Sequence, residues 1–289
     1  MTEETTRTLD VPGATLTYDV RPGGTPDAIP LFLTGSPMAA AGFGTLAGHF
    51  TDRTVVTYDP RGSERSQLTE PTTPPTPEQH ADDLHRIIQE LGGGPVDLFA
   101  SSGGAVNGLA LVARYPEDVR TLVAHEPPLP TLLPDREATL AAAGAVNETY
   151  KQRGWGAGMA HFIALVSYRG EFDAGFAEQP APDPAMFGLP TEDDGSRTDP
   201  LLGLALVGSI AYEPDFDALR GASTRIVPAA GVESEGELAN RGAFAVAERL
   251  GVEPVIFPSN HGGFLGGEYG QMGDPEAFAG KLRDVLAMR

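Results

Sequence analysis

The stretch Asp97-Leu98-Phe99-Ala100-Ser101-Ser102-Gly103-Gly104-Ala105 decides the interpretation of this sequence, because a strand, a tight turn and a helix meet within it. Residues 96–100 form a short and mostly apolar run, which is typical of a strand buried inside a sheet. Two serines and two glycines follow, and residues 103–115 then carry the small and aliphatic side chains of a buried helix. Such a turn exposes one residue at the carboxyl end of a sheet, where a reactive side chain can meet a substrate.

The spacing of the small residues selects Ser102 as the exposed residue. A nucleophile on so tight a turn needs small neighbours two positions away on either side, because the backbone is crowded there. Ala100 and Gly104 flank Ser102 in this way, whereas a nucleophile at Ser101 would place Phe99 in the crowded position. The helix that follows directs its N-terminal dipole and free N–H groups at the serine. We therefore expect Ser102 to be the nucleophile.

Short apolar runs alternate with helical patterns through most of the chain. The expected strands are residues 14–20, 29–34, 54–58, 96–100, 119–124, 224–230 and 254–257, and the expected helices of this part are residues 76–91, 103–115, 237–250 and 275–288. Strands that are apolar on both faces and alternate with helices are typical of an α/β fold. The sequence therefore predicts a mostly parallel central sheet flanked by helices.

The alternation stops between residues 127 and 222, where no convincing strand occurs. Connections between a strand and a helix are usually about 2–6 residues long, so this stretch is expected to be an inserted helical cap or lid. The core is then formed by residues 1–126 and 223–289.

The cap also offers candidates for an apolar substrate pocket. They are Trp155, Met159, Phe162 and Phe187, together with Met38 from an early loop. Because several of these side chains recur at helical spacing, packing inside the cap is the competing interpretation.

A general base and an acid are expected on loops at the same edge of the sheet. His261 lies in the loop after the last expected strand, where an imidazole can reach the serine. In chain order the acid falls between the serine and the histidine. Glu233 is favoured because it closely follows an expected strand, while Glu235 and Glu126, which ends an earlier strand, remain alternatives. The acid would hold the imidazole in one tautomer and stabilise the imidazolium.

An oxyanion hole requires two backbone N–H donors that point at the developing negative charge. Gly103, directly after the nucleophile, is the first candidate donor. The loop Thr34-Gly35-Ser36-Pro37 after an early strand offers the second. Pro37 has no N–H, so Ser36 is the expected donor.

These pieces resemble the α/β-hydrolase superfamily over the whole chain, and within it an esterase- or haloperoxidase-like branch with a serine nucleophile and a cap. The matching stretches are Phe32-Leu33-Thr34-Gly35-Ser36-Pro37, Tyr58-Asp59-Pro60-Arg61-Gly62-Ser63, Ala100-Ser101-Ser102-Gly103-Gly104, Gly231-Val232-Glu233 and Asn260-His261-Gly262. The sequence departs from the family pattern at Thr34, where a histidine is usual, and at Ala100, where glycine is usual. The resemblance implies a pocket between cap and sheet.

A serine at position 102 distinguishes between activities within this superfamily. Haloalkane dehalogenases and epoxide hydrolases of the same fold use an aspartate nucleophile, so Ser102 favours acyl chemistry. The expected function is a hydrolase that attacks an ester, lactone or thioester carbonyl and forms an acyl-enzyme intermediate. An acyltransferase, a cyclase or a cofactor-free perhydrolase could use the same residues, and a ligand-binding protein on an idle hydrolase scaffold is a third class.

Composition limits the remaining options. With 40 acidic and 20 basic residues the net charge is −20, which disfavours binding to nucleic acid or to an anionic membrane. The absence of cysteine excludes disulfides, thiolate metal sites and a cysteine nucleophile. The polar N-terminus lacks the features of a secretory signal, and no apolar run approaches the ~20 residues that span a bilayer. We expect a cytoplasmic enzyme with a small-molecule substrate and no metal or organic cofactor; a homodimer is left open.

Overall fold

The computed structural model describes residues 4–25, 28–70 and 73–288. The extreme ends of the predicted core, residues 1–3 and 289, lie outside this part of the chain, as does the start of the polar N-terminus. Within the described residues, no helix is both long and apolar enough to cross a membrane.

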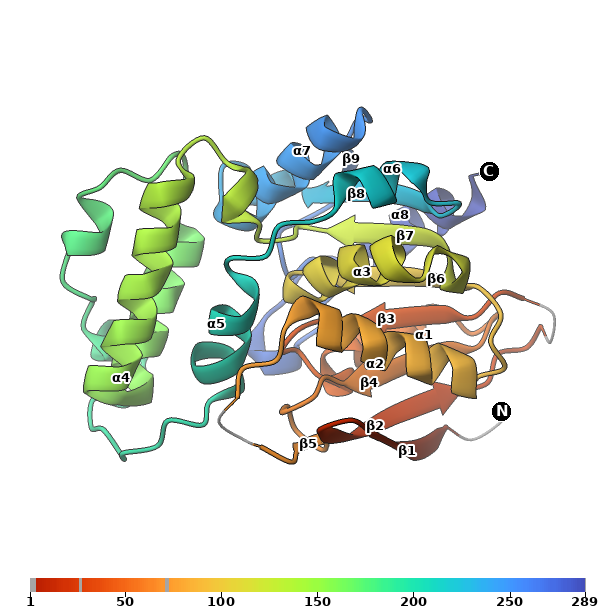
Figure 1. Ribbon diagram of the computed structural model, residues 1–289, viewed down its shortest axis with the longest axis horizontal. Helices are drawn as coiled ribbons and strands as arrows, with labels where there is room; N and C mark the ends of the chain where they lie inside the picture. Colours follow the sequence, from red (N-terminus) through yellow and green to blue (C-terminus); the bar gives the residue numbers. More distant parts are fainter. Residues whose placement is uncertain (1–3, 26–27, 71–72, 289) are drawn as a thin grey trace.

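One nine-stranded sheet organises the molecule (Figure 1). Its strands are β1 (Thr5–Val11), β2 (Ala14–Arg21), β3 (Leu31–Thr34), β4 (Val55–Asp59), β5 (Gln67–Leu68), β6 (Val96–Ser101), β7 (Val119–His125), β8 (Arg225–Gly231) and β9 (Val255–Phe257). They run in the order β1-β2-β4-β3-β6-β7-β8-β9, and β5 pairs with β2. The strands β4, β3, β6, β7, β8 and β9, which are neighbours in this order, run parallel to one another. In contrast, β2 pairs with β1, β4 and β5 in antiparallel fashion. The predicted mostly parallel α/β sheet is confirmed.

The strand β1 was not predicted, because its sequence carries no apolar pattern. Its side chains are mostly exposed. It is nevertheless paired with β2 along its whole length, from Thr5 opposite Val20 to Val11 opposite Ala14. Backbone pairing at an edge does not require a buried face, so periodicity could not reveal this strand.

Two helical layers cover the sheet, and alternate side chains of the central strands point into each. On one face α2 (Pro77–Glu90), α3 (Gly103–Arg114), α6 (Phe216–Gly221) and α7 (Leu238–Leu250) share a hydrophobic cluster with Leu98 and Ala100 of β6. On the other face α1 (Gly44–Gly48) and α8 (Pro275–Ala287) pack over Phe99. Burial on both faces explains why these strands are apolar without alternation.

The chain between β7 and β8 is helical and irregular. It contains α4 (Arg136–Ser167), α5 (Leu206–Ser209), the π-helical turn η6 (Pro200–Ala205) and the 3-10 turns η3 (Pro130–Leu132), η4 (Phe176–Glu178) and η5 (Pro184–Phe187), before α6 returns to the sheet. Further 3-10 turns are η1 (Ala40–Phe43), η2 (Pro116–Asp118), η7 (Val232–Ser234) and η8 (Glu268–Gly270). Figure 1 shows α4 set apart from the sheet, with α5 between them.

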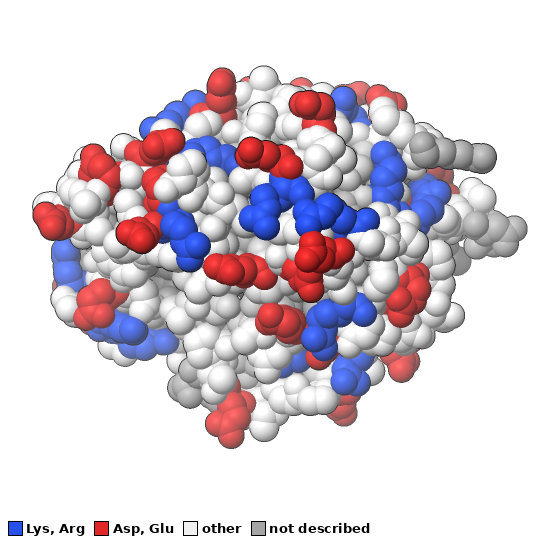
Figure 2. Space-filling model, turned by 45° about the horizontal axis from the view of Figure 1, so that its top comes forward, with Lys and Arg blue, Asp and Glu red and all other residues white. Residues whose placement is uncertain are grey.

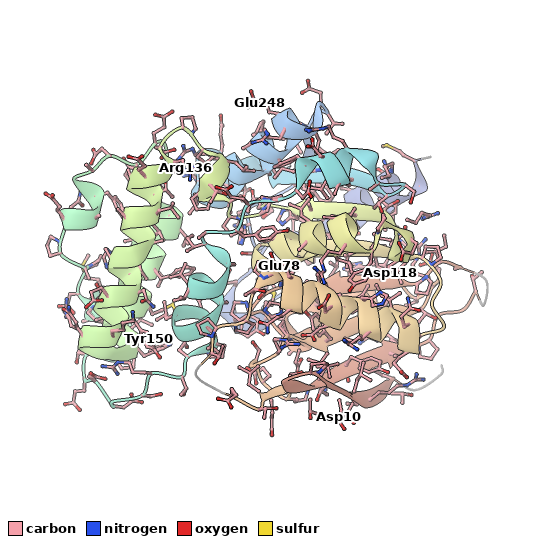
Figure 3. All side chains as sticks on the ribbon, in the orientation of Figure 1. Asp10, Glu78, Asp118, Arg136, Tyr150 and Glu248 are labelled. Atoms are coloured by element: carbon pink, nitrogen blue, oxygen red, sulfur yellow. The ribbon has the colours of Figure 1, made fainter. Side chains whose placement is uncertain are left out.

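The element α4 is a hairpin of two helices that meet at Gly154. This glycine has φ +83°, a left-handed conformation that reverses the chain direction. The two halves are joined by a hydrogen bond of 2.9 Å between Thr149 Oγ1 and His161 Nδ1. Tyr150, labelled in Figure 3, packs so tightly on the second half that a Cβ on Gly158 would lie 2.7 Å from its own Cβ.

An ion pair connects the base of this hairpin to α7, one of the helices that cover the sheet. Arg241 of α7 binds the carboxylate of Asp135, which precedes α4, and donates to the carbonyl of Gly170, which follows it, at 2.7 Å. Asp135 also accepts the N–H of Phe172 at 2.6 Å. Both ends of the hairpin are therefore attached to α7.

A buried ion pair between the loop after β4 and α2 supplies a test of this packing. Arg61 Nε donates to Asp83 Oδ2 at 2.6 Å, and the two side chains are only 5% and 0% exposed. Asp82, its neighbour, forms a half-exposed pair with Arg114. Asp83→Ala would leave Arg61 buried and unpaired, so we expect the free energy of unfolding to fall by about 3–5 kcal/mol. Asp82→Ala, the control, should cost less than about 1 kcal/mol.

Urea denaturation of both variants measures this difference. Equal losses of stability in the two would show that the Arg61–Asp83 pair does not hold the loop after β4 in place.

Candidate active site

Ser102 occupies the turn between β6 and α3 with φ +57° and ψ −130°. A left-handed φ is rare for residues other than glycine and costs on the order of 1–3 kcal/mol, so it persists only where the surrounding structure enforces it. One restraint is the hydrogen bond from Ser102 N–H to the carbonyl of His125, at 2.9 Å. By contrast, Ser101 is a buried strand residue whose hydroxyl contacts His125 Nδ1 at 3.1 Å.

The two glycines after Ser102 allow α3 to begin against the loop that follows β3. A Cβ on Gly103 would lie 2.5 Å from the carbonyl oxygen of Ser36, and one on Gly104 would lie 2.7 Å from that of Thr34. The predicted oxyanion donors, Ser36 and Gly103, are therefore in direct contact. Neither backbone N–H donates a hydrogen bond to a residue that the structure describes.

The carboxylate that contacts His261 is that of Glu126. His261 Nδ1 and Glu126 Oε2 lie 2.6 Å apart. Glu126 directly follows β7, is fully buried and has φ +49°, which turns its side chain from the end of one strand toward the loop after β9. Sequence reasoning considered Glu126 only as an alternative.

The expectation that Glu233 holds the imidazole is thereby corrected. The chain leaves β8 through η7 with the side chain of Glu233 exposed, and the polar contact of its carboxylate is Ser259 Oγ at 3.4 Å. Its backbone N–H donates to the carbonyl of Ser259 at 3.0 Å, so Glu233 contacts the loop of His261 without touching the ring. Glu235 is also exposed. The buried residue of this turn is Ser234.

Glu126 is ionised at neutral pH in this environment. Burial raises the pKa of Glu126, but the hydrogen bond from His261, the neighbouring His125 and the hydroxyl of Ser234 lower it by more, so that the pKa is about 2. An ionised carboxylate accepts the Nδ1–H of His261 and leaves Nε2 free as a proton acceptor.

Ser102 and His261 are connected indirectly, because both contact a third residue. Among the described residues no hydrogen bond joins Ser102 Oγ to His261. His125 links the two, because its carbonyl accepts the Ser102 N–H and its ring lies against that of His261, with centroids 6.0 Å apart. A serine hydroxyl turns about one bond, and catalytic hydrogen bonds often form only when substrate is bound.

The predicted pocket residues lie in several environments. Trp155, Met159 and Phe162 are half-buried and pack in a hydrophobic cluster formed by α4, its neighbouring turns and α7. Phe187 is 40% exposed. Met38 lies beside the predicted oxyanion loop, since a Cβ on Gly35 would be 2.7 Å from its Cβ.

A cavity of about 470 Å³ lies at another place, between β2, β4 and η1. Charged residues such as Asp19, Asp59 and Arg65 line it, and Ser102, Glu126 and His261 do not. Among the described residues no group of His, Asp or Glu side chains is placed to hold a metal ion.

His125 is a buried imidazole for which sequence reasoning found no role. It sits among aromatic rings, including Phe99 and Phe278, and its Nε2 has no partner among the described residues. The pKa of His125 is lowered to about 4, chiefly by burial; Glu126 opposes this shift and the nearby His261 contributes to it. His125 is therefore neutral at physiological pH.

This burial predicts an acid-sensitive stability. A histidine titrates near about 6.5 in an unfolded chain but at about 4 at position 125 of the folded chain. Between these values the unfolded chain binds more protons, so the free energy of unfolding should fall as the pH is lowered from about 6.5 to about 4. His125→Phe removes this titration, and unfolding should then take up fewer protons in the same window.

Urea unfolding at several pH values between 8 and 4 measures how the free energy of unfolding changes with pH in the parent and in His125→Phe. The difference between the two proteins at pH 8 corrects for the lost contact with Ser101. An identical slope in the variant would show that His125 is not buried in its neutral form.

Comparisons with known proteins agree with this architecture. Residues 31–158 match the family described as alpha/beta hydrolase fold. The chain is 33% identical over 262 residues to YraK, an uncharacterized hydrolase of Bacillus subtilis (strain 168), and the match covers 89% of each protein. Two similar solved structures are an esterase from Thermogutta terrifontis, with 21% identity, TM-score 0.64 and coverage of 99% and 98%, and the enol-lactonase from Burkholderia xenovorans LB400, with 18% identity, TM-score 0.65 and coverage of 98% and 100%. The 33% identity to YraK, together with the sheet and the strand–serine–helix turn, shows that the chain belongs to the α/β-hydrolase family.

Proposed function

We propose that the protein is a serine hydrolase that cleaves an ester, lactone or thioester through Ser102, His261 and Glu126. The observation that carries the proposal is the 2.6 Å contact between buried Glu126 and His261 Nδ1. It holds the imidazole with Nε2 free to act as a base, and Ser102, held at φ +57°, would be the nucleophile that this base serves. Geometry of this kind defines a serine triad better than position in the sequence does.

Each residue has a distinct role in the first step. His261 Nε2 accepts the hydroxyl proton of Ser102 as Ser102 Oγ attacks the carbonyl carbon. The carbonyl electron pair moves onto oxygen, and the N–H groups of Ser36 and Gly103 stabilise the resulting oxyanion. The electron pair on the oxyanion then re-forms the carbonyl, the bond from the carbon to the leaving group breaks, and the imidazolium gives its proton to that group, so that the acyl group stays on Ser102.

The second step repeats the first with water as the nucleophile. His261 removes a proton from water, the hydroxide attacks the acyl carbon, and the proton returns to Ser102 as the acid product leaves. Glu126 stays ionised throughout and stabilises the imidazolium by its charge, which is more effective at a buried position than in water.

The substrate class is inferred from similar proteins and from the charge of the chain. The names of the esterase and the enol-lactonase support a substrate with an activated carbonyl. Acidic and basic side chains are mixed on the face shown in Figure 2, without a field of one sign. Because the whole chain carries a net charge of −20, steering disfavours strongly anionic substrates. We infer a largely uncharged small molecule.

A panel of p-nitrophenyl esters and lactones tests the activity and its residues together. Ser102→Ala should lower kcat by about 10⁴-fold or more, since no other group can take up the acyl chain. Glu126→Gln should lower it by about 10³–10⁴-fold, because the amide favours the wrong imidazole tautomer. Glu233→Gln is the matched control and should stay within about twofold of the parent, because its exposed side chain does not touch His261.

Two outcomes would contradict this assignment. Undiminished turnover by Ser102→Ala would refute a serine mechanism, and a large loss in Glu233→Gln without one in Glu126→Gln would restore the acid expected from the sequence.

The oxyanion loop supplies a separate prediction. A methyl group at position 104 would collide with the backbone of Thr34 and Gly35 at 2.7 Å. In Gly104→Ala the loop must move and carry the Ser36 N–H out of place. We expect kcat to fall by about 10²–10³-fold, as when one oxyanion donor is lost.

Gly144→Ala is the control, because no atom lies within 4 Å of the added Cβ on α4. Its activity should be unchanged and its helix slightly more stable. Equal activity of the two variants would show that the β3 loop does not contribute to the oxyanion hole.

A further inference from the structure

The oxygen of Glu126 that does not face His261 is held by three donors. Glu126 Oε1 accepts the backbone N–H of Gly231 at 2.8 Å, the hydroxyl of Ser234, and Asn240 Nδ2 at 3.3 Å. We call these three residues the carboxylate seat. Ser234 is 0% and Asn240 3% exposed, so the seat lies beneath the site and does not contact a substrate.

The seat comes from a different part of the chain than the carboxylate. Gly231 ends β8, Ser234 lies in η7 and Asn240 in the first turn of α7, whereas Glu126 follows β7. Asn240 Nδ2 also donates to the carbonyl of Gly231 at 3.1 Å, and Ser234 Oγ lies 3.1 Å from the same oxygen. The space is tight, because a Cβ on Gly231 would lie 2.9 Å from Ser234 Oγ.

We propose that Ser234, assisted by Asn240, is a positioning residue that sets the orientation of Glu126 and thereby the strength of His261 as a base; this rests on the proposed function. A glutamate side chain turns about three bonds and loses considerable rotamer freedom when it is fixed. With Oε1 bound on three sides, only Oε2 can face His261 Nδ1. The carboxylate is thus oriented before substrate arrives.

The seat also changes how negative charge is shared between the two carboxylate oxygens. Donors at Oε1 draw charge away from Oε2 and weaken its attraction for a protonated His261. Removing the Ser234 hydroxyl strengthens that attraction, so the acid limb of the kcat/KM profile should move to higher pH. At the same time Glu126 gains freedom to rotate, and kcat should fall.

The other titratable groups around Glu126 stay the same in such variants. His261 and His125 face it from the loop after β9 and the end of β7, and Glu237 lies nearby at the start of α7. Glu237 is itself paired with Arg169 at 3.1 Å. A shift of the acid limb therefore reports on the seat.

The test measures kcat and KM between pH 4 and 9 for Ser234→Ala, Ser234→Cys and Asn240→Ala, with the best ester of the panel as substrate. Ser234→Ala should lower kcat about tenfold, as expected for loss of a hydrogen bond to a charged group. KM should change little, and the acid limb should rise by about half a pH unit. Ser234→Cys keeps the volume but offers only a weak donor, so it should shift the limb in the same direction. Asn240→Ala should have a smaller effect.

Ser259→Ala is the control, since it removes a neighbouring serine hydroxyl that contacts Glu233 at 3.4 Å and not Glu126. It should match the parent. Thermal melting of each variant separates loss of fold from loss of function.

Three results would overturn the proposal. The first is folded Ser234 variants with the parent's kcat and acid limb. The second is a loss of activity that follows the unfolded fraction while the limb stays in place, which would make Ser234 purely structural. The third is full activity in Ser102→Ala, which would remove the proposed function and the positioning role together. An inactive Ser102→Ala with parent-like Ser234 variants would overturn the positioning role alone.

Discussion

A buried negative charge is the constraint on which the rest of this site depends. Glu126 has no exposure to water, and an isolated carboxylate at such a depth would be neutral. It stays ionised because His261 binds one of its oxygens and three donors bind the other. The arrangement joins the end of β7, the turn after β8, the start of α7 and the loop after β9. Any change in the order of these elements would leave the charge unpaired.

The parallel sheet brings these elements together. The carboxyl ends of β6, β7, β8 and β9 lie at one edge, so the turns after them meet although they are far apart in the chain. Ser102 is bonded through its backbone to His125, the residue before Glu126. Ser102, His125 and Glu126 are therefore fixed relative to the same two strands. The α4 hairpin joins this unit at its base, through Arg241 and Asp135.

Sequence patterns revealed the sheet and the turn at Ser102 because those features are local. Seven strands carry their apolar runs in the sequence, and the small residues around Ser102 are needed by the turn itself. The carboxylate that contacts His261 was misassigned because that contact depends on side-chain direction. Glu233 follows a strand as a triad acid should, yet η7 turns it outward and Ser234 inward. The left-handed backbone that aims Glu126 at His261 has no signature in the residue types around it.

The most direct test of the account is to locate the covalent adduct formed with a fluorophosphonate by mass spectrometry of the digested protein. A serine activated as described should carry one phosphonyl group on Ser102, with Ser101 unmodified because it is buried in β6. Labelling should slow sharply when Glu126 is replaced by glutamine. A folded protein that takes up no label, or takes it up at another residue, would contradict the account.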